Sequence, residues 1–133
     1  MSNLSAVLDT SALLAYIKDE VCTKSLEDVI GTSVMSIINI TEAIIVLGRT
    51  NPIRLEYYQS AICELINHKY ETDSALMLLA SEISVKYREK HNLSLGDSYC
   101  LALGKHLDLP IFTADKIWHG LETKIGIKLK FIR

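Results

Sequence analysis

Short apolar runs alternate with longer segments of mixed apolar and polar residues along the 133 residues of the chain. Apolar runs bounded by turn-forming or charged residues are typical of buried strands, whereas apolar residues spaced three or four apart indicate helices. Strands are expected at Ser5–Leu8, Ser33–Ile38, Lys69–Thr72, Ile111–Thr113 and Ile127–Ile132. Helices are expected at Thr10–Lys18, Lys24–Ile30, Asn39–Gly48, Pro52–Asn67, Ser74–Lys90, Asp97–His106 and Lys116–Lys124. This alternation predicts a three-layer α/β/α sandwich with a mainly parallel central sheet of about four to five strands.

Length and composition favour a single domain over residues 1–133. The length lies in the usual range for one domain, about 100 to 150 residues, and 49% of the residues are hydrophobic. The three cysteines, Cys22, Cys63 and Cys100, lie far apart without metal-binding spacing, which favours reduced thiols in the cytoplasm. The apolar N-terminal segment has no preceding Lys or Arg and contains Asp9. We therefore expect neither a signal peptide nor a membrane span.

The charge is distributed unevenly along the chain. Residues 1–66 contain four basic and eight acidic residues, whereas residues 67–133 contain ten and eight. From Lys116 to the last residue there are five basic residues and one acidic residue. Such a basic stretch is typical either of a surface that attracts phosphate or of a solvated edge protected by lysines. The sequence leaves both interpretations open.

Four acidic residues stand just past apolar stretches of the chain: Asp9, Glu42, Asp97 and Asp115. Parallel strands end at one edge of their sheet, and open α/β folds bind ligands there, so we expect these carboxylates to meet. Helix capping is the alternative explanation, because Asp is a preferred N-cap and Glu42 follows Asn39 at capping-box spacing. The two roles are compatible, since a capping carboxylate can also bind a cation.

A cluster of carboxylates predicts Mg²⁺ or Mn²⁺ chemistry on phosphate. These hard cations prefer oxygen ligands and use a few carboxylates together with water. A bound cation activates water and offsets charge on a scissile phosphate. The four histidines show no zinc-binding spacing, and the sequence lacks the G-x-S-x-G, P-loop and G-x-G-x-x-G motifs. Zinc enzymes, common serine hydrolases and nucleotide-binding folds are therefore disfavoured.

Four segments resemble the PIN-domain family, and within it the VapC-type toxin ribonucleases of prokaryotic toxin–antitoxin pairs. They are VLDTSALLAYI at 7–17, SIINITEAI at 36–44, LSLGDSYCLALGKHLDLPIFTAD at 93–115 and KIW at 116–118. The resemblance implies a Mg²⁺- or Mn²⁺-dependent endoribonuclease that cleaves RNA as the toxin of a type II pair. It also implies a homodimer that is held inactive by a small cognate antitoxin protein.

The resemblance further assigns roles to individual residues. It implies that Asp9, Glu42, Asp97 and Asp115 form the catalytic metal site, and that Ser11, Asn39 and Thr113 orient those carboxylates. Lys116 is predicted to contact a substrate phosphate or to be an ordinary surface lysine. Trp118 is expected either to pack in a core or interface or to stack on an unpaired base.

Other classes of protein remain open at this point. A phosphoacceptor receiver domain has a similar length and an acidic metal pocket, but paired acids would follow its first strand, where this chain has Thr10 and Ser11 after Asp9. A dehalogenase-type phosphatase would carry D-x-D there. A non-catalytic module could bind RNA or protein through the same pocket.

Overall fold

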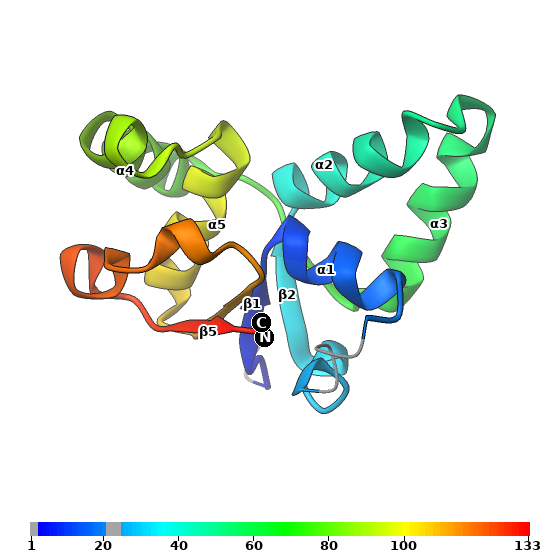
Figure 1. Cartoon of the computed structure of the whole chain (residues 1–133), viewed down its shortest axis with the longest axis horizontal. Helices are drawn as coiled ribbons and strands as arrows, with labels where there is room; N and C mark the ends of the chain where they lie inside the picture. The colour runs from blue at the N-terminus through cyan, green and yellow to red at the C-terminus, as the bar shows by residue number, and fades with distance from the viewer. Residues whose placement is uncertain (1–2, 21–24) are drawn as a thin grey trace.

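The computed structural model describes residues 3–20 and 25–133 of the chain. Its helices gather on the two sides of a central sheet (Figure 1). The strands are β1 (Ala6–Leu8), β2 (Ser33–Ser36), β3 (His68–Tyr70), β4 (Ile111–Thr113) and β5 (Leu129–Phe131). They lie in the order β3-β2-β1-β4-β5, and every neighbouring pair is parallel. The predicted three-layer fold is therefore confirmed, with an all-parallel sheet of five strands in the described residues.

Helices connect the strands and cover both faces of the sheet. The α-helices are α1 (Thr10–Ile17), α2 (Ile37–Gly48), α3 (Leu55–Leu65), α4 (Ser74–His91) and α5 (Leu95–Leu107). Shorter helical turns are η2 (Ile30–Thr32), η3 (Pro52–Arg54), η4 (Lys116–Trp118) and η5 (Glu122–Gly126), of which the last is a π-helical turn. None of the helices in the described ranges is both long and apolar enough to cross a membrane.

Alternate side chains of the central strands form two separate cores. Val7 and Val34 pack with residues of α4, α5 and the C-terminal segment, whereas Leu8 and Met35 pack with residues of α1, α2 and α3. Successive side chains of a strand point to opposite faces, so a strand covered on both faces is apolar throughout. Strand β1 follows this rule, because all three of its residues are fully buried.

The strand order excludes one alternative. Receiver domains have the flavodoxin-like order 2-1-3-4-5, whereas here β1 lies between β2 and β4, and β3 lies at the edge. The receiver interpretation is therefore wrong for this chain.

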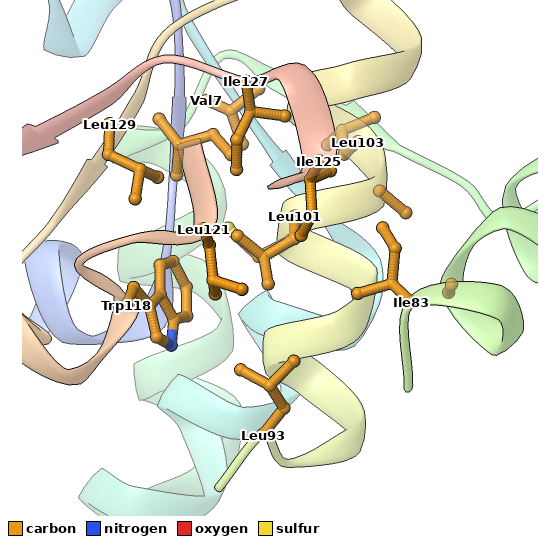
Figure 2. Close-up of a cluster of buried hydrophobic side chains, with 14 of the residues drawn as sticks. Val7, Ile83, Leu93, Leu101, Leu103, Trp118, Leu121, Ile125, Ile127 and Leu129 are labelled. Carbon is orange, nitrogen blue, oxygen red and sulfur yellow. The ribbon is translucent and has the colours of Figure 1, made fainter. Parts of the chain in front are cut away.

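The segment predicted as a helix at Lys116–Lys124 is instead broken into two turns. Gly120 lies between them with a φ of +95°, which an α-helix does not contain. Trp118 and Leu121 still point inwards and are fully buried (Figure 2). Of the two alternatives for Trp118, packing in a core is therefore confirmed, while the helical prediction was wrong because of the glycine.

Other boundaries also differ from the predictions. The predicted helix at Lys24–Ile30 is wrong where it is described, because residues 25–30 form 3-10 and other turns, and Lys24 lies outside the described residues. Strand β2 ends at Ser36 rather than at Ile38, since the Ser36 hydroxyl accepts a hydrogen bond from the Ile38 N–H and starts α2. Cys22 also lies outside the described residues, and the other two cysteines are free thiols.

Candidate active site

Asp9 stands at the C-terminal end of β1 and is the N-cap of α1. Its carboxylate accepts hydrogen bonds from the Ala12 N–H and the Thr113 hydroxyl, each at 2.8 Å, and from the Ser11 hydroxyl at 2.8 and 2.9 Å. Only 3% of the residue is exposed. Burial raises the pKa of Asp9 to about 6, and the nearby charge of Asp97 contributes in the same direction. Asp9 is therefore a rigidly held carboxylate that is costly to ionise without a cation.

The hydroxyls of Ser11 and Thr113 join Asp9 to the neighbouring strand end. Ser11 Oγ accepts a hydrogen bond from the Ala114 N–H at 2.9 Å. Thr113 Oγ1 accepts from the Asp115 N–H, also at 2.9 Å. Each hydroxyl thus donates to Asp9 and accepts from the backbone that follows β4, so the two side chains fix Asp9 relative to Asp115.

Asp97 lies in the first turn of α5 and Asp115 at the start of η4. The sequence placed Asp97 at a helix start, but α5 begins at Leu95, and Ser94 is its N-cap. Asp97 is the reciprocal member of a capping box: its Oδ2 accepts from the Ser94 N–H at 2.9 Å. Burial raises the pKa of Asp97, and the charges of Asp115 and Glu42 raise it further. Asp115 is an N-cap as expected, with Oδ1 accepting from the Ile117 N–H at 3.2 Å.

Glu42 projects from α2 onto the first turn of α5. Its Oε1 accepts from the Thr10 hydroxyl at 2.8 Å and from Asn39 Nδ2 at 3.1 Å. The carboxylate also lies directly over the Cα of Gly96, where a β-carbon would collide with it. Gly96 is therefore the residue that allows Glu42 to approach α5 so closely.

Asn39 lies inside α2 rather than at its N-cap, because Ser36 caps the helix. The expected Asn39–Glu42 capping box is therefore wrong. Asn39 Nδ2 donates to the Gly96 carbonyl at 3.0 Å as well as to Glu42, and so links α2 to α5. Its Oδ1 is buried without a partner among the described residues. Asn39 thus helps to place Glu42 beside α5, which agrees with an orienting role.

The four carboxylates interact electrostatically as one group. Asp97 raises the pKa of Asp9, while Glu42 and Asp115 raise that of Asp97. Burial, and then the charges of Asp9, Asp97 and Glu42, raise the pKa of the Cys100 thiol well above its usual value. The structure therefore brings the predicted acidic residues together at one edge of the sheet.

The donor set fits a hard cation. As the side chains stand, no group of three or more His, Cys, Asp or Glu residues in the described part of the chain is arranged to hold a metal ion. The hydrogen bonds from described residues fall on Oε1 of Glu42, Oδ2 of Asp97 and Oδ1 of Asp115. The other carboxylate oxygen of each residue receives none from the described part of the chain. Mg²⁺ needs only one or two carboxylates and retains several waters. An all-oxygen set with three such oxygens suits Mg²⁺ or Mn²⁺.

Sequence reasoning missed three positions of the site: Thr10, Ser94 and Gly96. The S-L-G-D segment carries the spacing of a capping box, which would have identified Ser94. Thr10 and Gly96 have no such signal, because their importance comes from Glu42, which is distant in sequence. Lys116 is exposed next to Asp115. Trp118 is fully buried and so is not available to stack on a base.

Comparisons with known proteins identify the family and the fold. The sequence matches the family described as PIN domain over residues 6–123. A toxin–antitoxin complex from Klebsiella pneumoniae has a similar chain, with 19% identity over 97% of this chain and 98% of the other and a TM-score of 0.69. DNA-bound VapBC from Salmonella typhimurium gives 14% identity, 98% and 99% coverage and a TM-score of 0.73. The sarcin–ricin-loop-cleaving toxin VapC20 of Mycobacterium tuberculosis has 19% identity over 92% of this chain and 96% of the other, with a TM-score of 0.69.

Comparison with curated protein sequences finds no match. The family match extends from β1 past η4, and so it contains all four carboxylates of the site. The solved structures show that the whole fold is shared with toxins of toxin–antitoxin pairs. The chain belongs to the PIN domain family.

Proposed function

We propose that this chain is a Mg²⁺- or Mn²⁺-dependent endoribonuclease and the VapC-type toxin of a type II toxin–antitoxin pair. The observation that carries the proposal is the convergence of four carboxylates at one sheet edge. Ser11 and Thr113 join Asp9 to the backbone around Asp115, and Glu42 lies against Gly96, the residue before Asp97. Helix capping, which explains Asp9, Asp97 and Asp115 singly, needs no such proximity. A metal site that cleaves a phosphodiester does need its carboxylates to lie close together.

Asp9 and Asp97 are the proposed direct ligands, and Glu42 and Asp115 bind the cation directly or through water. When bound, the cation makes a water molecule more nucleophilic and offsets charge on the scissile phosphate. Because burial raises the pKa of Asp9 to about 6, a neighbouring cation would stabilise the charged form of this carboxylate.

The surrounding residues hold the carboxylates in place. Ser11 and Thr113 orient Asp9 through their hydroxyls, and Asn39 orients Glu42 through its amide. Lys116 is exposed beside Asp115 and offers a positive charge for a phosphate of the substrate.

The fold neighbours support the identity of the partners. One neighbour is described as a toxin that cleaves the sarcin–ricin loop, and others are toxin–antitoxin complexes. We therefore propose RNA as the substrate, a small cognate antitoxin as the inhibitor, a homodimer as the assembly and the cytoplasm as the location. Exposed apolar side chains on α2, η3 and α3 supply contact surface for association: Ile45, Ile53, Leu55 and Tyr57.

The test is cleavage of total cellular RNA by purified protein freed of any bound partner. Reactions contain Mg²⁺, Mn²⁺ or EDTA, and the Asp97→Asn variant is the matched control, because its amide oxygen can still accept the Ser94 N–H bond. Discrete fragments with either metal, absent in EDTA and with Asp97→Asn, are expected. Fragments that persist in EDTA or with the variant would contradict the metal site. Folded protein that cuts no RNA with either metal would favour the non-catalytic module.

A further inference from the structure

A second charged region lies outside the carboxylate cluster, between α4 and η5. An open pocket of about 240 Å³ occurs there, lined partly by Lys86, Lys105 and Lys124 together with Glu82. Figure 1 shows α4 above the C-terminal turns on one side of the molecule. Lys105 donates to the Ile125 carbonyl at 2.6 Å, so its role is structural. The other two lysines are exposed, and neither makes an ion pair with a described residue.

Positive charges in this region are crowded and unpaired. Lys90 lies beside Lys124 and lowers the pKa of Lys124, because two ammonium groups that lie close together disfavour each other's charge. In the described ranges the only ion pair within 4.0 Å joins Arg133 and Glu20, so no carboxylate pairs with Lys86, Lys90 or Lys124. Like charges placed side by side are destabilising. An anion between them would remove that repulsion.

A chain of contacts connects these lysines to the acidic site. The Ile117 N–H donates to Asp115, and the Ile117 carbonyl lies 3.4 Å from His91 Nδ1. His91 Nε2 in turn lies 3.5 Å from Lys124 Nζ. Because the Ile117 carbonyl can only accept a hydrogen bond, it favours the His91 tautomer that carries its proton on Nδ1. In that tautomer Nε2 has a lone pair, which faces the ammonium of Lys124. The lysine cluster therefore adjoins the edge of the site at η4.

The chemistry of a nucleic-acid strand matches this arrangement. A polynucleotide carries one negative charge per phosphate, and a strand that enters a cleavage site must be held beyond the reacting bond. Carboxylates at the site repel the flanking phosphates unless cations hold them. Lysines beside the site supply that attraction without reading the bases.

We propose that Lys90 and Lys124, assisted by Lys86, form a phosphate-binding subsite that holds the RNA backbone next to the carboxylate site. The choice of RNA as ligand rests on the proposed function. The subsite itself rests on the unpaired lysines and their contact with η4 through His91.

The test measures binding without cleavage. A fluorescein-labelled single-stranded oligouridine RNA is titrated with protein in EDTA, and fluorescence anisotropy is recorded at several KCl concentrations. The variant is Lys90→Gln/Lys124→Gln. The control, Lys18→Gln/Arg49→Gln, removes the same charge from the exposed C-cap positions that follow α1 and α2. All four positions are exposed, so thermal melts are expected to show folded protein in every case.

The expected effect follows from counterion release. The salt dependence of binding is the slope of log affinity against log salt concentration. Each phosphate contact that is lost to a single strand lowers the magnitude of this slope by about 0.7. Two lost contacts lower it by about 1.4, which corresponds to roughly 25-fold weaker binding at 0.1 M salt if the affinity at 1 M is unchanged. The control variant is expected to bind nearly as wild type does. Equal weakening of the two variants, unchanged binding by the Lys90/Lys124 variant or absence of binding by wild type would each overturn the subsite.

The outcome is separable from that of the cleavage assay. A protein that binds RNA through these lysines but cuts none would retain the subsite and lose the proposed nuclease activity. A protein that cuts RNA with unchanged binding in the Lys90/Lys124 variant would retain the activity and lose the subsite.

Discussion

Asp9 and Asp73 perform the same structural task in very different surroundings. Each precedes a helix, and each accepts the backbone N–H three residues later at 2.8 Å, from Ala12 and Leu76 respectively. Asp73 is exposed, and its pKa is lowered, first by the Leu76 N–H bond and then by the Tyr70 hydroxyl. Asp9 is buried beside another carboxylate, and its pKa is raised to about 6.

The contrast separates capping from site chemistry. A cap needs only an acceptor oxygen, and Asp73 shows that an exposed aspartate supplies one with its charge stabilised. At Asp9 the same cap carries a desolvated charge near Asp97, an arrangement that destabilises the metal-free fold. Capping alone therefore explains Asp73 but not Asp9. A bound cation would supply the missing compensation.

The largest expected difference is in RNA cleavage. Asp9→Asn should lower activity by more than the roughly 10- to 100-fold that follows loss of an outer-shell partner of a metal. Asp73→Asn should leave activity within about twofold of wild type, because Asp73 lies on the α4 cap away from the carboxylate cluster. Initial rates on one RNA with Mn²⁺ would measure both. Similar losses in the two variants would mean that activity follows helix capping rather than the site.

Gly96→Ala should affect activity strongly and stability weakly. The new methyl group would collide with the Glu42 carboxylate, which is the mobile end of a side chain and can move aside. We expect at least about a tenfold loss of cleavage with a small change in the melting temperature, since removing a partner that orients metal ligands costs about that much. Gly31→Ala is the control, because nothing lies within 4 Å of the added carbon. Full activity of Gly96→Ala would show that the position of Glu42 is unimportant.

The pH dependence of stability should differ in sign between the two caps. The folded protein holds the Asp9 proton up to about pH 6, whereas the unfolded chain releases it near the ordinary value of 3.8. Stability of the metal-free protein therefore falls as pH rises through this window, by about 3 kcal/mol for this group. The difference in unfolding free energy between Asp9→Asn and wild type should therefore shift in favour of the variant by about that much from pH 4 to pH 7.

Asp73→Asn should behave in the opposite way. In wild type, the lowered pKa of Asp73 contributes stability at pH values above the pKa of this group in the unfolded chain. That contribution is lost as the pH falls. The variant should therefore be less stable than wild type at pH 7 and should approach it in acid. Urea unfolding in EDTA at a series of pH values would measure both differences. Parallel curves for wild type and Asp9→Asn would contradict the raised pKa of Asp9.

The sequence allowed much of the fold to be predicted, because apolar runs and their spacing act locally. The strands β1, β2 and β4 were expected within about two residues of their observed ends, and the acidic residues that follow β1 and β4 were assigned to the correct edge. Parallel pairing then brings these residues together without further information.

The remaining features depend on contacts between distant residues. Gly96 gives no signal of its own, because its role comes from Glu42, which lies on another helix. The failure at Lys116–Lys124 has a local cause, since apolar spacing predicted a helix where Gly120 adopts a positive φ. The proximity of Lys90 and Lys124 required the fold, because α4 and η5 are far apart in the chain.

The most direct test of the site is a titration of Mn²⁺ followed by electron paramagnetic resonance of the free ion. Wild type, Asp97→Asn and Asp73→Asn are compared at pH 7.5 without RNA, so that binding is measured apart from catalysis. Mn²⁺ binding by wild type and Asp73→Asn, together with its loss in Asp97→Asn, is the predicted result. Equal binding by all three proteins, or no binding by folded wild type, would contradict a cation site formed by these carboxylates.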